Sequence, residues 1–261
     1  MQYAVIIIVA LSVSTLTLFS GFGLGTMLMP TFALFFPVEV AVAATAVVHL
    51  TNHLFKVFLI GKRADFGIVA RFAIPAAIFA ILGAYLLVSF AEIPPLSRFT
   101  LFGRECEVTL IKLVIACLIA FFALFDLIPQ LTKMSFGRKW IPLGGVLSGF
   151  FGGLSGHQGA LRTAFLIKAI QQKETFIGTV VVSAVIVDVT RLIVYGVTFF
   201  SPHFISLESG LPGMVLAGML SAFTGSFIGL RLLKKVTMKG IQTIVGILLL
   251  LVALGLGTGL I

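Results

Sequence analysis

The sequence predicts an all-α polytopic membrane protein with two repeated halves in inverted orientation, and three observations lead to this prediction. First, 59% of the 261 residues are hydrophobic and only 10% are charged, whereas a soluble domain carries about 25% charged residues. Second, a glycine-rich segment interrupts the apolar pattern twice, at 21–25 and at 152–159. Third, a basic residue lies inside an apolar stretch at nearly the same distance after each break.

These basic residues are Lys56 and Arg191, which follow the last glycine of the preceding break by 56 − 25 = 31 and 191 − 159 = 32 residues. The similarity extends to their neighbours, because His53-x-x-Lys56 aligns with Asp188-x-x-Arg191 at an offset of 135 residues. The sequence therefore indicates a duplicated unit in which each half places one cation inside the membrane.

The apolar runs define the expected helices. They cover 4–20, 24–36, 40–60, 66–90, 108–129, 141–154, 158–170, 174–200, 210–230 and 241–260. Six runs reach the length of about 20 residues that a spanning helix needs. The first two runs and the pair 141–154 and 158–170 are short, and each pair meets at a glycine break. A broken helix persists at membrane depth only where protein or a wet cavity surrounds it. We expect each short pair to form a hairpin; the alternative is two complete spans joined by a tight turn.

The charges in the gaps between runs predict the orientation of the helices. Lys and Arg gather in gaps 61–71, 131–140 and 231–240, whereas gap 201–209 has neither. Because short cytoplasmic loops are enriched in Lys and Arg, we expect the first three gaps inside and the last outside.

Counting crossings between these gaps gives each half one glycine-broken hairpin plus three transmembrane helices. Three is an odd number, so the second half is inverted relative to the first. We therefore expect a single membrane domain, 1–261, with a first repeat in 1–130 and a second in 141–261. A plain eight-helix arrangement is the alternative, but it puts gaps 201–209 and 231–240 on the wrong sides.

The composition excludes several functional classes. A net charge of +9 favours nucleic acid as the partner of a soluble protein, but here the basic residues border apolar runs, so the expected partner is the lipid bilayer. The spans contain no HExxH, GxSxG or paired carboxylates, so we expect neither an enzyme nor a cofactor. The first residues lack the basic start of a cleaved signal peptide. We expect a multi-pass protein of a cell membrane, as in the bacterial inner membrane.

Ionisable residues inside the membrane are costly and usually functional. His53 and Lys56 share one helical face, and so do Asp188 and Arg191, because each pair is three residues apart. For Lys56 the alternative is that its side chain extends to the membrane interface. For Asp188 and Arg191 the alternative is a purely structural salt bridge.

His49 lies one turn before His53 and adds a titratable group to the same face. Histidine changes charge near neutral pH, so these residues are candidates for carrying a coupled proton. Packing histidines held by hydrogen bonds are the alternative. A divalent-metal site at His49 and His53 is a further possibility, and it needs help from His157 or Asp188.

Each glycine break also offers the amino-terminal end of a second half-helix. The unpaired N–H groups and the positive dipole end at such a terminus attract anions. The expected anion-binding residues at the breaks are Gly23, Gly25, Thr26, Ser155, Gly156, His157, Gln158 and Gly159. Arg162 follows on the second half-helix and is expected to complete the site, with anchoring at the cytoplasmic interface as its alternative.

Two motifs resemble a known family. The first runs from Ser20-Gly21-Phe22-Gly23-Leu24-Gly25-Thr26 to Pro30 and continues as Val40-Ala41-Val42-Ala43-Ala44-Thr45; the second is Gly149-Phe150-Phe151-Gly152-Gly153-Leu154-Ser155-Gly156. Over essentially the whole chain, these segments resemble the TauE/SafE family of sulfite-exporter-like membrane proteins. The resemblance implies a transporter of small sulfur-containing anions, such as sulfite, thiosulfate or organosulfonates. Leu24 interrupts the glycine run, and no proline in the second half matches Pro30, so the exact anion stays open.

From these features we expect alternating access, with the anion held between the two glycine-broken helices. His53, Lys56, Asp188 and Arg191 are expected to contribute to its binding. A passive anion channel is the first alternative function, and a divalent-metal carrier that uses His49 and His53 is the second.

Overall fold

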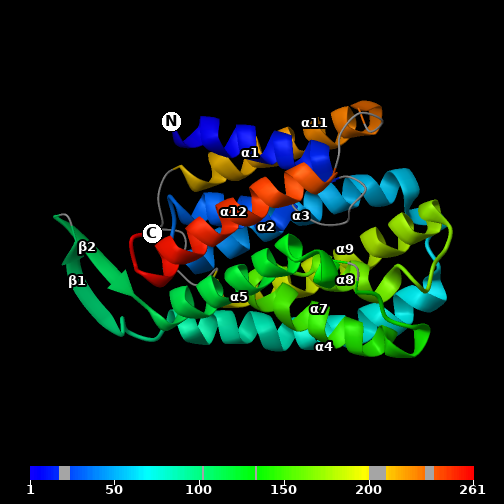
Figure 1. Cartoon of the computed structure of the whole chain (residues 1–261), viewed down its shortest axis with the longest axis horizontal. Helices are drawn as coiled ribbons and strands as arrows, with labels where there is room; N and C mark the ends of the chain where they lie inside the picture. The colour runs from blue at the N-terminus through cyan, green and yellow to red at the C-terminus, as the bar shows by residue number, and fades with distance from the viewer. Residues whose placement is uncertain (18–23, 102, 133, 200–209, 233–237) are drawn as a thin grey trace.

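The helices and strands are taken from a computed structural model, which describes residues 1–17, 24–101, 103–132, 134–199, 210–232 and 238–261 (Figure 1). The helices of the first half are α1 Gln2–Thr17, α2 Leu24–Ala33, α3 Val38–Ile60, α4 Phe66–Ala91, α5 Leu110–Leu127 and the short α6 Pro129–Thr132. Those of the second half are α7 Ile141–Ser155, α8 Gly159–Leu166, α9 Lys173–Phe199, α11 Leu211–Leu232 and α12 Met238–Gly257. Short 3-10 turns, η1 Gly61–Arg63 and η2 Arg138–Trp140, follow α3 and precede α7.

Four stretches of the described residues are long and apolar enough to cross a membrane. They are Val38–Arg63, Phe66–Ala91, Lys173–Val197 and Leu211–Gly229. The sequence predicts six such spans, and the apolar stretches described in α5 and α12 are shorter. Large apolar side chains such as Phe58 and Val197 are exposed on the outer surface, as expected where lipid replaces water.

The helices pack in reciprocal pairs that mix the two halves. Helix α1 packs on α11, and α7 packs on α4. Helices α3 and α9 pack against each other, and so do α5 and α12. Figure 1 shows α1 beside α11 on one side of the molecule and α4 beside α7 on the other.

Glycines on α7 bring its backbone into direct contact with α4. A Cβ atom at Gly149 would overlap the backbone of Ala76, and one at Gly153 would overlap that of Ala80. Small residues of this kind allow close packing, which holds membrane helices together through van der Waals contact. The α4–α7 pair is therefore tightly joined.

The α1–α11 pair is joined in the same way, with added polar contacts. Gly225 and Gly229 of α11 lie against the backbone of α1. The hydroxyl of Ser14 donates to the Ala222 carbonyl over 2.6 Å and lies 2.7 Å from the Ser226 hydroxyl. Hydroxyls that bond across helices stabilise membrane packing.

The described fold is predominantly helical, as predicted, and a short β-hairpin is the exception. Between α4 and α5, strand β1 Ser97–Leu101 pairs antiparallel with β2 Arg104–Val108. Figure 1 shows the hairpin projecting from one end of the helix bundle. Its exposed Arg98 and Glu107 form an ion pair of 2.8 Å. Because the hairpin is short and polar, the apolar runs used to find the helices do not reveal it.

The second glycine break occurs as predicted. Helix α7 ends at Ser155, Gly156 adopts φ of 80°, and α8 begins at Gly159. A left-handed residue at this position is typical of a helix end, and glycine adopts it without strain. Of the predicted first break, 21–25, residues 21–23 lie outside the described residues, and Leu24 and Gly25 belong to α2.

Candidate anion-binding site

Asp188 on α9 is the centre of a buried polar cluster. Its side chain has no exposed surface, and three residues bind its carboxylate. Arg191 donates from Nη2 and Nε to Oδ1 over 2.7 and 3.0 Å, Gln158 donates to the same oxygen over 2.9 Å, and His53 Nδ1 lies 2.7 Å from Oδ2. We call His53, Lys56, Gln158, Arg162, Asp188 and Arg191 the Asp188 cluster.

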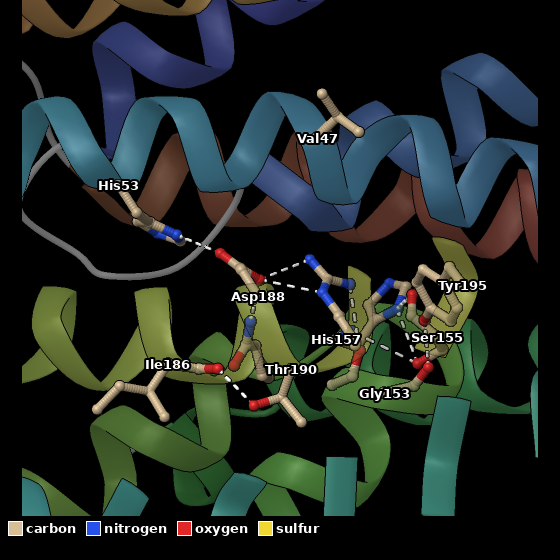
Figure 2. Close-up of polar contacts among 12 residues, drawn as sticks. Val47, His53, Gly153, Ser155, His157, Ile186, Asp188, Thr190 and Tyr195 are labelled. Carbon is tan, nitrogen blue, oxygen red and sulfur yellow. Dashed lines mark hydrogen bonds and ion pairs between the residues drawn. The ribbon is translucent and has the colours of Figure 1, made fainter. Parts of the chain in front are cut away.

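The contact between His53 and Asp188 joins the equivalent positions of the two sequence halves. Figure 2 shows His53 reaching from α3 toward Asp188. These residues align at an offset of 135, and the structure brings them together where α3 packs on α9.

Arg191 also reaches the carboxyl end of α7, beside the second break. Its Nη1 donates to the Gly152 carbonyl over 3.2 Å, and one turn later the hydroxyl of Tyr195 donates to the Gly153 carbonyl. The last carbonyls of a helix lack helical partners and favour a positive charge. Arg191, which follows the second break by 32 residues in the sequence, therefore contacts the end of the helix that precedes it. Tyr195 was not predicted, because nothing in its spacing distinguishes it from a packing aromatic residue.

Gln158 links Asp188 to Arg162 across the break. Its amide nitrogen donates to Asp188, while its amide oxygen accepts from Arg162 Nη1 over 3.1 Å. Arg162 is only 1% exposed, and its Nε has no hydrogen-bond partner. This burial contradicts the alternative in which Arg162 anchors the protein at the membrane surface. It leaves one N–H of a buried guanidinium free to bind a ligand.

His157 lies in the break itself and is 2% exposed. Its ring stacks on Phe122 of α5, with ring centroids 5.5 Å apart and planes 9° apart. Nδ1 lies 3.1 Å from the Ser155 carbonyl, which only accepts, so Nδ1 carries the hydrogen. Nε2 has no partner and presents a lone pair inside the protein. The hydroxyl of Ser155 donates to the Phe151 carbonyl over 3.0 Å.

Helix α3 carries a buried polar stripe made of Thr45, His49, Asn52 and Lys56. Thr45 Oγ1, both ring nitrogens of His49 and the amide nitrogen of Asn52 have no hydrogen-bond partner. Lys56 is 7% exposed, which contradicts the alternative of a side chain extended to the interface. Buried polar atoms are nearly always hydrogen-bonded, so this concentration of unpaired atoms indicates space for water or a ligand along α3.

His49, His53 and Asp188 place one possible ligand atom each within 4.8 Å of one another, which is the geometry of a metal site. The positive charges around Asp188 are unfavourable for binding a metal cation. Both oxygens of Asp188 are already bound by donors, and two further buried cations belong to the same cluster. A divalent cation is therefore a poor match for these residues.

Comparison with protein families decides the class of this protein. The family model described as sulfite exporter TauE/SafE matches residues 6–256. The chain belongs to the sulfite exporter TauE/SafE family. Membership makes it a membrane transporter of sulfur-containing anions in general, rather than a member of an enzyme family. No protein of curated function and no solved structure matches the chain.

The structure brings most of the predicted site residues together. At the second break and the contact between α3 and α9 lie the following predicted residues: His53, 155–159, Arg162, Asp188 and Arg191. Gly25 and Thr26 lie in the first turn of α2, and Gly23 lies outside the described residues. Asn52, whose side-chain oxygen accepts from Ser226 over 2.8 Å, extends the polar region.

Proposed function

We propose that the protein carries sulfite, thiosulfate or an organosulfonate across the cell membrane and binds the anion at the Asp188 cluster. The observation that carries this proposal is Arg162, a buried cation beside a helix break with an unpaired N–H. The first turn of α8 adds backbone N–H groups that lack helical partners, a common anion-binding arrangement. Family membership supports the chemical class of the anion.

The reciprocal packing of the helices supports alternating access between inverted repeats. If 1–130 and 141–261 are related by a two-fold axis, each contact between unlike helices must occur twice and each contact on the axis once. The pairs α1–α11 and α4–α7 are such a duplicate, while α3–α9 and α5–α12 join equivalent helices. Inverted-repeat transporters bind substrate near the membrane midplane at the repeat interface, which corresponds here to α3 and α9.

The close glycine contacts between α4 and α7 and between α1 and α11, which we call seams, indicate which helices move together. Each seam joins a helix of one half to a helix of the other, so the moving bodies are not the two sequence halves. One body contains α4 and α7, and the other contains α1 and α11. Their relative rocking exposes the α3–α9 contact to each side of the membrane in turn. A passive channel lacks this cycle and shows neither saturation nor counterflow.

Coupled protons are a further part of the proposal. His53 is bound to Asp188, and the ring of His49 packs edge-on against it with centroids 5.2 Å apart. A proton gained by His53 strengthens its attraction to Asp188 and changes the charge beside the anion. Such a group is able to link proton and anion movement.

Counterflow in proteoliposomes tests the proposed function. Purified protein is reconstituted, loaded with unlabelled thiosulfate, and supplied outside with labelled thiosulfate. We expect transient accumulation of label in the wild type and its loss in Arg162→Gln. Arg71→Gln, which removes an exposed arginine of α4, serves as the matched control and should behave as the wild type. Wild-type counterflow in folded Arg162→Gln protein would rule out Arg162 as a site residue.

A further inference from the structure

The Asp188 cluster contains more positive than negative charge. Its basic side chains are Lys56, Arg162 and Arg191, and its one carboxylate is Asp188; all four are buried. With the neighbouring histidines His49, His53 and His157 neutral, three positive charges face one negative charge, which leaves an excess of two.

One of the three cations, Arg191, forms an ion pair with the carboxylate. Arg191 makes two N–H bonds to Oδ1 of Asp188, and both side chains are fully buried. Two donors from one guanidinium form a charge-assisted contact that is shorter and stronger than a neutral hydrogen bond. This pair is close to neutral as a unit.

The other two cations form no ion pair with Asp188, although its charge attracts Arg162. Among the described residues, no carboxylate lies within ion-pair distance of Lys56 or Arg162. Arg162 binds the neutral amide of Gln158 instead, and the Lys56 ammonium and Arg162 guanidinium repel each other. Buried unpaired charges are strongly unfavourable, so this pair is complete only when an anion is present.

We propose that the site selects a doubly charged oxoanion over a singly charged sulfonate of the same size. This inference rests on the proposed function, because it assumes that the anion binds at the Asp188 cluster. A dianion balances Lys56 and Arg162 together, whereas a monoanion leaves one buried cation uncompensated. The unpaired Nε of Arg162 supplies a donor to the bound oxygen.

Sulfate and methanesulfonate form a matched pair of probes. Both are tetrahedral at sulfur and similar in size, but a methyl group replaces one oxygen in methanesulfonate and the charge falls from two to one. Thiosulfate is a second dianion, and hydrogen phosphate shows whether charge alone suffices. All are compared by titration calorimetry with the purified full-length protein in lipid nanodiscs at pH 7.5.

We expect sulfate or thiosulfate to bind at least about tenfold more tightly than methanesulfonate, since buried charges interact strongly. In Lys56→Gln and in Arg162→Gln the dianion affinity falls and this preference is lost. Lys56→Arg keeps the charge and retains the preference. Lys62→Gln, which removes an exposed lysine just beyond α3, leaves both affinities unchanged.

The outcomes separate this inference from the proposed function. Equal or tighter binding of methanesulfonate by the wild type overturns the dianion preference and leaves anion binding intact. Binding of none of the probes contradicts the proposed function itself. The melting temperature of each variant is measured first, because an unfolded variant gives no binding result, and Arg162→Gln and the wild-type comparison provide independent tests. An unchanged preference in a folded variant also overturns the inference.

Discussion

The two polar pairs that align in the sequence, one in each half, differ in their electrostatic character. On α9, Asp188 and Arg191 neutralise each other, and both side chains are fully buried. On α3 the equivalent residues are His53 and Lys56, and neither carries a negative charge. The Asp188 carboxylate contacts both pairs, because it binds Arg191 on α9 and His53 on α3. In the proposed site, one of the two aligned pairs is therefore balanced in charge and the other is not.

The largest expected effect comes from removing the shared carboxylate. Asp188→Ala leaves Arg191 buried without a counter-charge and should destabilise the protein by about 3–5 kcal/mol, as is typical when one partner of a buried ion pair is removed. Thermal unfolding in nanodiscs measures the loss. In the double variant Asp188→Leu with Arg191→Met most of the stability should return, whereas transport should not. A stable Asp188→Ala protein would contradict the central role of this carboxylate.

A second prediction compares the two helix seams. Gly149→Leu should prevent α7 from approaching α4 and destabilise the protein by more than the roughly 1–3 kcal/mol of an overpacked core, since its side chain meets backbone rather than side chains. Gly225→Leu should act similarly on α1 and α11. Gly137→Leu is the control, because a Cβ atom there meets nothing within 4 Å. Melting temperatures distinguish the three variants, and a tolerated Gly149→Leu would argue against a rigid α4–α7 body.

A third prediction concerns the histidine on the α3 side. His53→Gln keeps a side chain able to donate to Asp188 but does not titrate near neutral pH. We expect its stability to change by only about 1 kcal/mol, the size of one hydrogen bond. Thiosulfate flux should persist, and its acceleration by a pH gradient should disappear. The measurement is initial flux with and without an imposed gradient, and unchanged acceleration would exclude His53 as the coupling group.

The smallest effect is expected at the surface ion pair of the β-hairpin. Arg98 and Glu107 are 70% and 43% exposed, and exposed pairs contribute at most about 1 kcal/mol. Arg98→Ala should therefore leave both the melting temperature and the flux close to wild-type values. A large loss of flux in this variant would show that the hairpin takes part in transport.

The sequence predicts the helices well wherever an apolar run is long, as in α3, α4 and α9, because length and hydropathy alone identify such spans. It also predicts the cluster around the second break, because Arg162, Asp188 and Arg191 are charged residues inside apolar runs. It does not predict that Gln158 bridges Asp188 and Arg162, since that contact depends on how α8 turns back toward α9.

The reciprocal helix pairing was also beyond the sequence. The small residues of α7 and α11 can be read from the sequence. Because glycine and alanine are common throughout membrane helices, they do not indicate which helix packs against them. The β-hairpin was missed for a different reason. Strands Ser97–Leu101 and Arg104–Val108 are short, polar and close to a charged gap, and their pairing gives no signal in hydropathy.

The α1–α11 seam has a consequence for biosynthesis. The hydrogen bond from Ser14 to Ala222 joins residues 208 positions apart. At about 5–20 residues per second, the ribosome makes the partner of α1 roughly 10–40 s after α1 itself. During that interval the Ser14 hydroxyl lacks its partner in α11, and so does the face of α1 that packs against Gly225 and Gly229. Helix α1 therefore reaches its native packing only after α11 has been made, although Ser14 is synthesised 208 residues before Ala222.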